Sequence, residues 1–152
     1  MKKFSIFLIA FLSLLLFGCS KREAISYGDF KNMAEKNEYT VVEVTEQFKE
    51  YDYIKGAYLA VSSDTNYQVE FYLFEDDKGA KSFYDLNKEI FESQGSGSNV
   101  STTKDSKNFN KYTLITDKMY NTITRIDNTV VYSTSDKNYK DNVIKLVNKL
   151  GY

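Results

Sequence analysis

The sequence predicts an α+β domain in which an antiparallel sheet of about six strands carries two to three helices, packed mainly on one face. Strand-like segments follow one another through short polar connections that suit hairpins. Apolar residues recur at helical spacing in three other segments, which lie between groups of strands rather than after every strand. This order favours antiparallel pairing over a parallel βαβ arrangement.

Three segments have the pattern of helices, and their ends carry capping residues. Ser26 suits the N-cap of the first helix, with Asp29 at its third position. Asp76 or Asp77 can cap the second helix, and Gly151 suits the end of the third. The predicted helices span residues 27–36, 77–93 and 139–150.

Six segments rich in β-branched and aromatic residues are predicted strands. Short polar connections at residues 63–66, 117–118 and 127–128 suit hairpin turns. Residues 46–53 are compatible with a short helix or an extended connection. The predicted strands span residues 40–45, 57–62, 67–74, 111–116, 119–126 and 129–134.

The longest polar stretch, GSGSNVSTTKDSKN, covers residues 95–108. We expect a surface loop here, with a weak edge strand or a domain boundary as alternatives. Neither flanking half would hold a sufficient core alone. Residues 26–152 are therefore predicted to form one domain.

The N-terminus has the pattern of an export signal. Lys2 and Lys3 precede a nearly continuous apolar run from Phe4 to Phe17. This run fits the apolar region of a signal peptide better than a membrane span, which needs about 20 residues. The folded domain is therefore expected to begin after residue 18.

The end of this segment, Leu16-Phe17-Gly18-Cys19, resembles the lipobox of bacterial lipoproteins. The resemblance implies that residues 1–18 are removed, that a peptidase cuts between Gly18 and Cys19, and that a diacylglyceryl group is attached to the Cys19 sulfur. Two acyl chains, at about 0.8 kcal/mol per buried methylene, give stable anchoring. Residues 19–25 would then form the lipidated N-terminus and a short tether, on the extracytoplasmic face of the cell membrane.

The domain itself is similar in length and in two segments to small uncharacterised lipoproteins of low-GC Gram-positive bacteria. These segments are EKNEYTVVEVT, residues 35–45, and TRIDNT, residues 124–129. The similarity supports the location and brings no site residues with it.

Composition excludes several classes of chemistry. The chain has no histidine, and Cys19 is its single cysteine, so His-dependent nucleophiles, disulfides and the usual zinc, haem and iron-sulfur ligand sets are missing. Without residues 1–18, which contain two lysines, 18 basic residues face 21 acidic ones, a formal net charge of −3. This balance argues against nucleic acid as a partner. We predict no cofactor and no metal site.

Carboxylates offer the one catalytic alternative, a small hydrolase of envelope glycans. Glu70, Glu75, Asp76 and Asp77 lie close together in the sequence, and a glycosidase needs two carboxylates across a sugar. However, Glu70 is expected on a solvated strand face and the other three have a helix-capping explanation. The same run lacks the spacing of an EF-hand calcium loop.

Cations and aromatic residues alternate within residues 107–125. On strands, lysines usually form the solvated face while aromatic rings pack inward. A surface for an acidic wall polymer or nucleic acid is the alternative interpretation. The residues concerned are Lys107, Lys111, Lys118 and Arg125, with Phe109, Tyr112 and Tyr120.

These observations predict a membrane-anchored extracytoplasmic lipoprotein that acts as a non-catalytic binding or accessory module of the cell envelope. Its expected partners are membrane lipid, through Cys19, and an envelope protein or wall polymer. The hydrolase and an inhibitor or immunity-type lipoprotein are the alternative functions.

Overall fold

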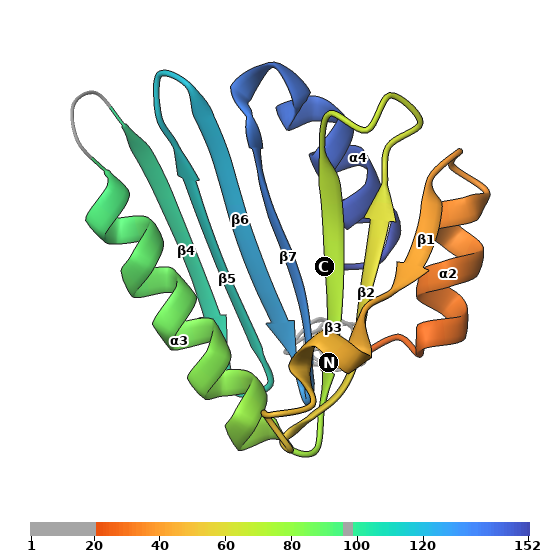
Figure 1. Cartoon of the computed structure of the whole chain (residues 1–152). Coiled ribbons are helices and arrows are strands. Elements are labelled where there is room, and N and C mark those ends of the chain that lie inside the picture. Colours follow the sequence, from red (N-terminus) through yellow and green to blue (C-terminus); the bar gives the residue numbers. More distant parts are fainter. Residues whose placement is uncertain (1–20, 96–98) are drawn as a thin grey trace, which may run out of the picture.

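The computed structural model describes residues 21–95 and 99–152, which form one antiparallel sheet with three α-helices against it (Figure 1). The strand order is β1-β2-β3-β7-β6-β5-β4. Two meanders, β1 to β3 and β4 to β7, meet where β3 pairs with β7 at the centre of the sheet. The predicted α+β class and the antiparallel sheet are confirmed.

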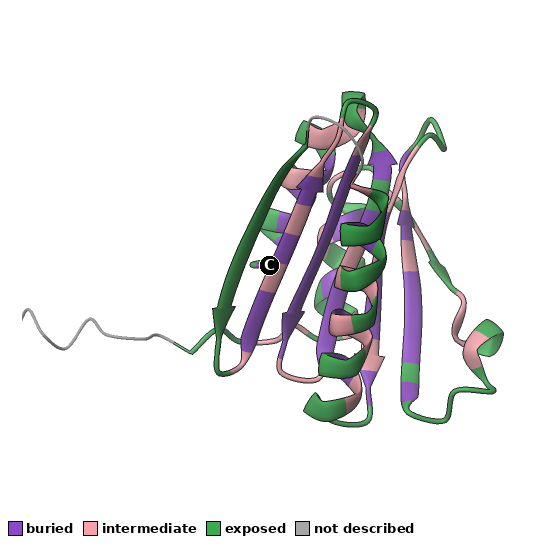
Figure 2. Cartoon of the chain, turned by 90° about the vertical axis from the view of Figure 1, so that its left-hand side faces the viewer, coloured by how far each residue is buried: buried purple, intermediate pink, exposed green. Residues whose placement is uncertain are grey.

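The sheet has seven strands rather than about six, and β4 is the additional one. Residues 95–108, expected as a loop, contain this edge strand, which pairs with β5 from Val100 opposite Ile115 to Ser106 opposite Phe109. Figure 2 shows that β4 is exposed along its whole length. The loop expectation was wrong for these residues because an edge strand with both faces in solvent needs no apolar alternation. The strands are β1 (Thr40–Glu43), β2 (Ile54–Val61), β3 (Gln68–Phe74), β4 (Val100–Ser106), β5 (Phe109–Ile115), β6 (Met119–Ile126) and β7 (Thr129–Asp136).

The helices lie close to their predicted positions. Ser26 caps the first helix in a capping box with Asp29, and Asp76 caps the second through the main-chain N–H of Gly79 at 2.7 Å. Residues 46–53, left open by the sequence, include the end of a short 3-10 helix followed by a turn. The helical elements are α2 (Tyr27–Glu35), η2 (Thr45–Phe48), α3 (Asp77–Gln94), η3 (Lys137–Tyr139) and α4 (Lys140–Lys149).

Each face of the sheet has its own apolar core. On one face, α2 and α4 pack against the sheet, and the rings of Phe30 and Phe71 stack with centroids 5.0 Å apart. On the opposite face, α3 contributes Tyr84 and Phe91, which pack with Tyr72. Burying each such ring contributes roughly 1.5–3 kcal/mol. Two of the three helices thus share one face, and α3, on the near side in Figure 1, covers the other.

Residues 19–25, expected as a short tether, are described only from Lys21 onward, and this part lies against the domain. Ala24 and Ile25 pack on the first core, and the main-chain carbonyl of Arg22 accepts a hydrogen bond from the Asn108 side chain at 2.7 Å. Apolar residues 24 and 25 explain why the segment docks rather than extends. Among the described residues, no helix is long and apolar enough to cross a membrane.

Candidate functional site

A groove of about 550 Å³ runs between α4 and the sheet surface of β4 and β5. Its wall is the flank of α4 that carries Lys140, Ile144 and Asn148, which recur every four residues and therefore share one side of the helix. We call it the basic groove because four cations line it: Arg22, Lys104, Lys111 and Lys140.

Strand pairing brings the central cations of the basic groove together. Lys104 on β4 lies directly opposite Lys111 on β5, so their side chains leave the same face of the sheet. Phe109 and Tyr120 reach the same face and line the groove beside the cations. The groove therefore combines positive charge with aromatic rings.

Arg22 is held at the end of the basic groove by its contacts with the domain. Its guanidinium carbon lies 3.9 Å above the centroid of the Phe109 ring, a cation–π geometry. Its Nη1 donates to the main-chain oxygen of Gly151 at 3.2 Å. These contacts fix the charge of Arg22 next to Lys111.

Lys111 is the most constrained cation of the groove. The residue is half-buried, and its Nζ donates to the main-chain oxygen of Tyr152 at 3.2 Å. Burial, followed by the positive charges of Arg22 and Lys104, lowers the pKa of Lys111. Like charges thus converge where solvent screens them incompletely.

No Asp or Glu side chain is among the residues that line the basic groove. Within the described residues, Lys140 has an acidic neighbour, Asp141, at 3.8 Å, but the Asp141 side chain is 90% exposed and such a pair is worth little. An anion bound between Arg22, Lys104 and Lys111 would remove their mutual repulsion. The arrangement therefore favours a negatively charged ligand.

The structure separates the cations that the sequence grouped together in residues 107–125. Lys107 and Lys118 lie in hairpin turns at opposite ends of β5, and only Lys111 lines the basic groove, where Phe109 and Tyr120 accompany it. Tyr112 points to the other face and packs against Phe91.

Arg125 also belongs to the opposite face, where its role is structural. Its side chain is buried, with Nε donating to Asn110 Oδ1 at 2.7 Å and Nη1 to the main-chain oxygen of Asp127 at 2.9 Å. It is therefore removed from the candidate binding surface.

Sequence reasoning missed Arg22, Lys104 and Lys140 as parts of the site. The signal that could have found Lys104 is its register with Lys111, which depends on recognising β4 as a strand. Arg22 lies before the first helix and Lys140 lies at the start of α4, so only the tertiary fold brings them to the groove beside Lys104.

Two carboxylates of the hydrolase alternative, Glu70 and Glu75, are engaged by different neighbours. Glu70 accepts hydrogen bonds from Gln68 at 2.8 Å and from the Tyr72 hydroxyl. Glu75 directly follows β3, and its carboxylate lies 3.6 Å from the Nζ of Lys55 on the neighbouring strand β2. Five strand residues place Glu70 and Glu75 roughly 16 Å apart along the chain, beyond the ≈ 5–9.5 Å that separate glycosidase carboxylates.

Asp76 and Asp77 lie at the start of α3, where Asp76 is the N-cap and Asp77 is in the first turn. No group of three or more acidic or cysteine side chains that could hold a metal occurs in the part of the chain that the structure describes. The predicted lipidation and cleavage residues, Cys19 and Gly18, lie outside the described residues.

Comparisons with protein-family models, curated proteins and solved structures gave no match to this chain.

Proposed function

We propose that this chain is a membrane-anchored extracytoplasmic lipoprotein whose domain is a non-catalytic binding module for an anionic component of the cell envelope. The observation that carries the proposal is the convergence of Arg22, Lys104 and Lys111 in a groove without an Asp or Glu side chain. These cations lie together in a protein whose overall formal charge is negative. Local binding of acidic groups, rather than general attraction to polyanions, is the function this supports.

The floor of the basic groove suggests the form of the ligand. Phe109 and Tyr120 line the groove with buried rings, and the half-buried Ile144 adds apolar surface from the α4 wall. Such a surface suits an extended ligand whose acidic groups alternate with less polar parts, such as a wall polymer or an acidic segment of an envelope protein.

The proposed anchor would lie next to the groove. Cys19 precedes Arg22 by three residues, so their Cα atoms are at most roughly 11 Å apart. If Cys19 carries lipid, the Arg22 end of the groove stays near the membrane surface. Ligands attached to the membrane or close to it would then be favoured.

The anchor is tested by metabolic labelling with a fatty acid, followed by membrane fractionation. The chain should incorporate the label and sediment with membranes, and the Cys19→Ala variant should lose the label. Unchanged labelling of Cys19→Ala would disprove the lipoprotein assignment. It would not affect the proposal that the basic groove binds an anionic ligand.

The groove is tested by binding of fluorescent poly-L-glutamate to the chain in mild detergent. Lys104→Gln with Lys111→Gln should weaken binding at least tenfold. The control, Lys107→Gln with Lys118→Gln, removes the same charge from the two turns and should change affinity less than twofold. Equal losses in both variants would show that only the overall charge matters and would refute the groove as a site.

A further inference from the structure

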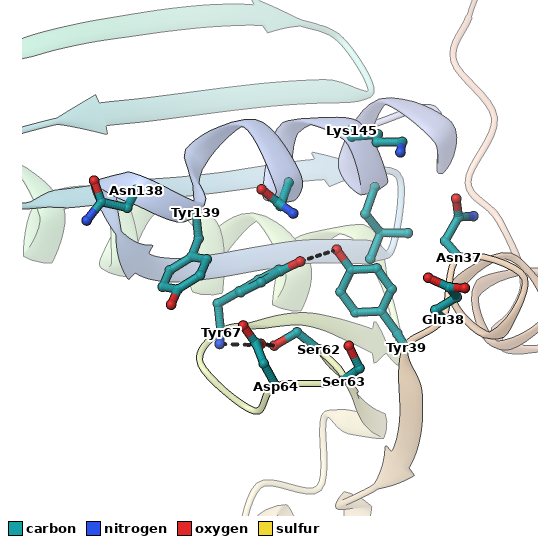
Figure 3. Close-up of a pocket in the computed structure, with 12 residues that line it drawn as sticks. Asn37, Glu38, Tyr39, Ser62, Ser63, Asp64, Tyr67, Asn138, Tyr139 and Lys145 are labelled. Carbon is teal, nitrogen blue, oxygen red and sulfur yellow. Dashed lines mark hydrogen bonds between the residues drawn. The ribbon is translucent and has the colours of Figure 1, made fainter.

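A second cavity, of about 390 Å³, lies on the other flank of α4 (Figure 3). We call it the tyrosine cleft because Tyr39, Tyr67 and Tyr139 line it. These residues come from the connection between α2 and β1, from the β2–β3 hairpin and from η3, which meet at one end of the sheet. Figure 1 shows the hairpin and η3 at the end opposite the N-terminal segment.

The cleft and the Arg22 end of the basic groove are separated by the length of the strands. Arg22 accepts its hydrogen bond from Asn108 in the β4–β5 turn, and this turn lies at the end of the sheet opposite the β2–β3 hairpin. A strand of eight residues spans roughly 26 Å. A chain held near Arg22 therefore presents the tyrosine cleft away from its point of attachment.

The three tyrosines form one continuous aromatic surface. The rings of Tyr67 and Tyr139 stack with centroids 4.9 Å apart, and Tyr39 meets Tyr67 edge-on at 5.9 Å. The hydroxyls of Tyr39 and Tyr67 lie 3.0 Å apart and share a hydrogen bond. Burial raises the pKa of Tyr39 far above its ordinary value, so this hydroxyl remains neutral.

The hairpin below these rings is preformed. Asp64 accepts hydrogen bonds from the Ser62 hydroxyl at 2.7 Å and from the Asn66 side chain at 2.8 Å. These bonds lower the pKa of Asp64 and use its carboxylate within the loop. Thr65 takes a left-handed conformation, φ 57°, which is costly for a β-branched residue and is held by these contacts. A ligand would therefore meet a fixed wall.

The remaining polar groups of the cleft are uncharged or oppositely charged. The side chains of Ser63, Asn138 and Asn142 make no hydrogen bond to another described residue. Glu38 and Lys145 contribute one charge of each sign. The cleft thus offers aromatic rings, amides and hydroxyls without the excess of positive charge found in the basic groove.

We propose that the tyrosine cleft binds an uncharged oligosaccharide segment. The apolar faces of sugar rings would pack on the tyrosine surface, while sugar hydroxyls exchange hydrogen bonds with Asn138, Asn142 and Ser63. The site is independent of the basic groove, because the two use opposite flanks of α4 and ligands of different charge.

The test is saturation-transfer NMR and calorimetry with the full chain in mild detergent. The probes are chitotetraose, cellotetraose and maltotetraose. At least one should bind with submillimolar affinity, and Tyr139→Ala should weaken that binding at least tenfold. Because Tyr139 packs on Tyr67, the exposed Asn142→Ala provides a second variant that leaves the packing intact, with an expected loss of about fivefold.

Tyr51→Ala is the matched control, since Tyr51 is 49% exposed and lies in the turn between η2 and β2, outside the cleft. Its affinity for the sugar should stay within twofold of the unchanged chain. Failure of all three sugars to bind would overturn the proposal, as would equal losses in Tyr51→Ala and Asn142→Ala. Binding of an acidic peptide at the cleft in place of the sugars would also overturn it.

Discussion

At the scale of single residues, burial and partners decide what each cation does. Arg125 and Lys111 lie on neighbouring strands and look equivalent in the sequence. Arg125 is buried with its donors satisfied by Asn110 and main-chain oxygens, whereas Lys111 faces a groove with two other cations. The alternation of strand residues places them on opposite faces of the sheet, so charge alone did not distinguish them.

We predict that Arg125→Gln lowers the free energy of unfolding by about 3 kcal/mol, because it removes charged hydrogen bonds and leaves buried acceptors unsatisfied. Urea unfolding followed by circular dichroism measures this loss. Lys118→Gln, an exposed cation in a turn, should stay within about 0.5 kcal/mol of the unchanged chain. Similar effects of both substitutions would contradict the structural role of Arg125.

Lys111 should make groove binding sensitive to alkaline pH. Its pKa in the folded chain is below the ordinary 10.5, so it loses its proton at a lower pH than an exposed lysine. Affinity for poly-L-glutamate should therefore fall as pH rises through this lowered pKa. In Lys111→Arg the charge persists, and the fall should be delayed to higher pH.

The lowered pKa of Lys111 also makes the stability of the folded chain depend on pH. Between the lowered pKa and 10.5, the unfolded chain binds more protons at this lysine than the folded chain. The contribution of Lys111 to the free energy of unfolding therefore rises with pH across that window, while binding weakens. If affinity and pH were unrelated in this range, Lys111 would not be a ligand-binding cation.

At the scale of elements, α4 organises both candidate sites. Val143, Leu146 and Val147 face the core, one flank lines the basic groove and the other lines the tyrosine cleft. The helical spacing predicts Val143, Ile144, Leu146, Val147 and Leu150 toward the core, and all of them are buried except Ile144, which is half-buried and lines the basic groove. The spacing could not predict that the two flanks of α4 line cavities, because each cavity also needs residues that the sheet and its loops place beside the helix.

Two helices end in the same way for a local reason. Glu38 after α2 and Gly151 after α4 both have positive φ, and each precedes a tyrosine whose N–H returns to the helix, to Ala34 and Val147 respectively. The sequences that follow the two helices, KNEY at residues 36–39 and KLGY at residues 149–152, are similar because they share this helix-capping geometry.

The start of α3 gives a prediction that separates capping from catalysis. Asp76→Ala should lower the free energy of unfolding by about 1 kcal/mol, since it removes the acceptor for the Gly79 N–H. Asp76→Asn should retain most of the stability, because asparagine caps helices about as well. Thermal unfolding measures both. A severe loss in Asp76→Asn would mean that the carboxylate charge has a role beyond the cap.

At the scale of the whole molecule, periodicity predicted the fold but not the sites. Apolar alternation identified β3, and helical spacing identified α3 within one residue at its C-terminal end. β4 was not predicted as a strand, because all of its residues are exposed and it therefore has no alternation of apolar and polar residues. The tyrosine cleft joins segments around residues 39, 67 and 139, and their proximity follows from a sheet order that local patterns do not encode.

The two sites should respond differently to salt, because only the basic groove gathers several charges of one sign. Raising NaCl from 0.05 to 0.5 M shortens the distance over which exposed charges interact, from about 14 Å to about 4 Å. Poly-L-glutamate binding at the basic groove should therefore weaken at least tenfold, while binding of a neutral sugar at the tyrosine cleft should change less than twofold. Titrations of both probes over this range measure the difference. A parallel loss at both sites would mean that one electrostatic surface serves both ligands, whereas independent responses support a module that binds acidic and neutral groups on the two flanks of α4.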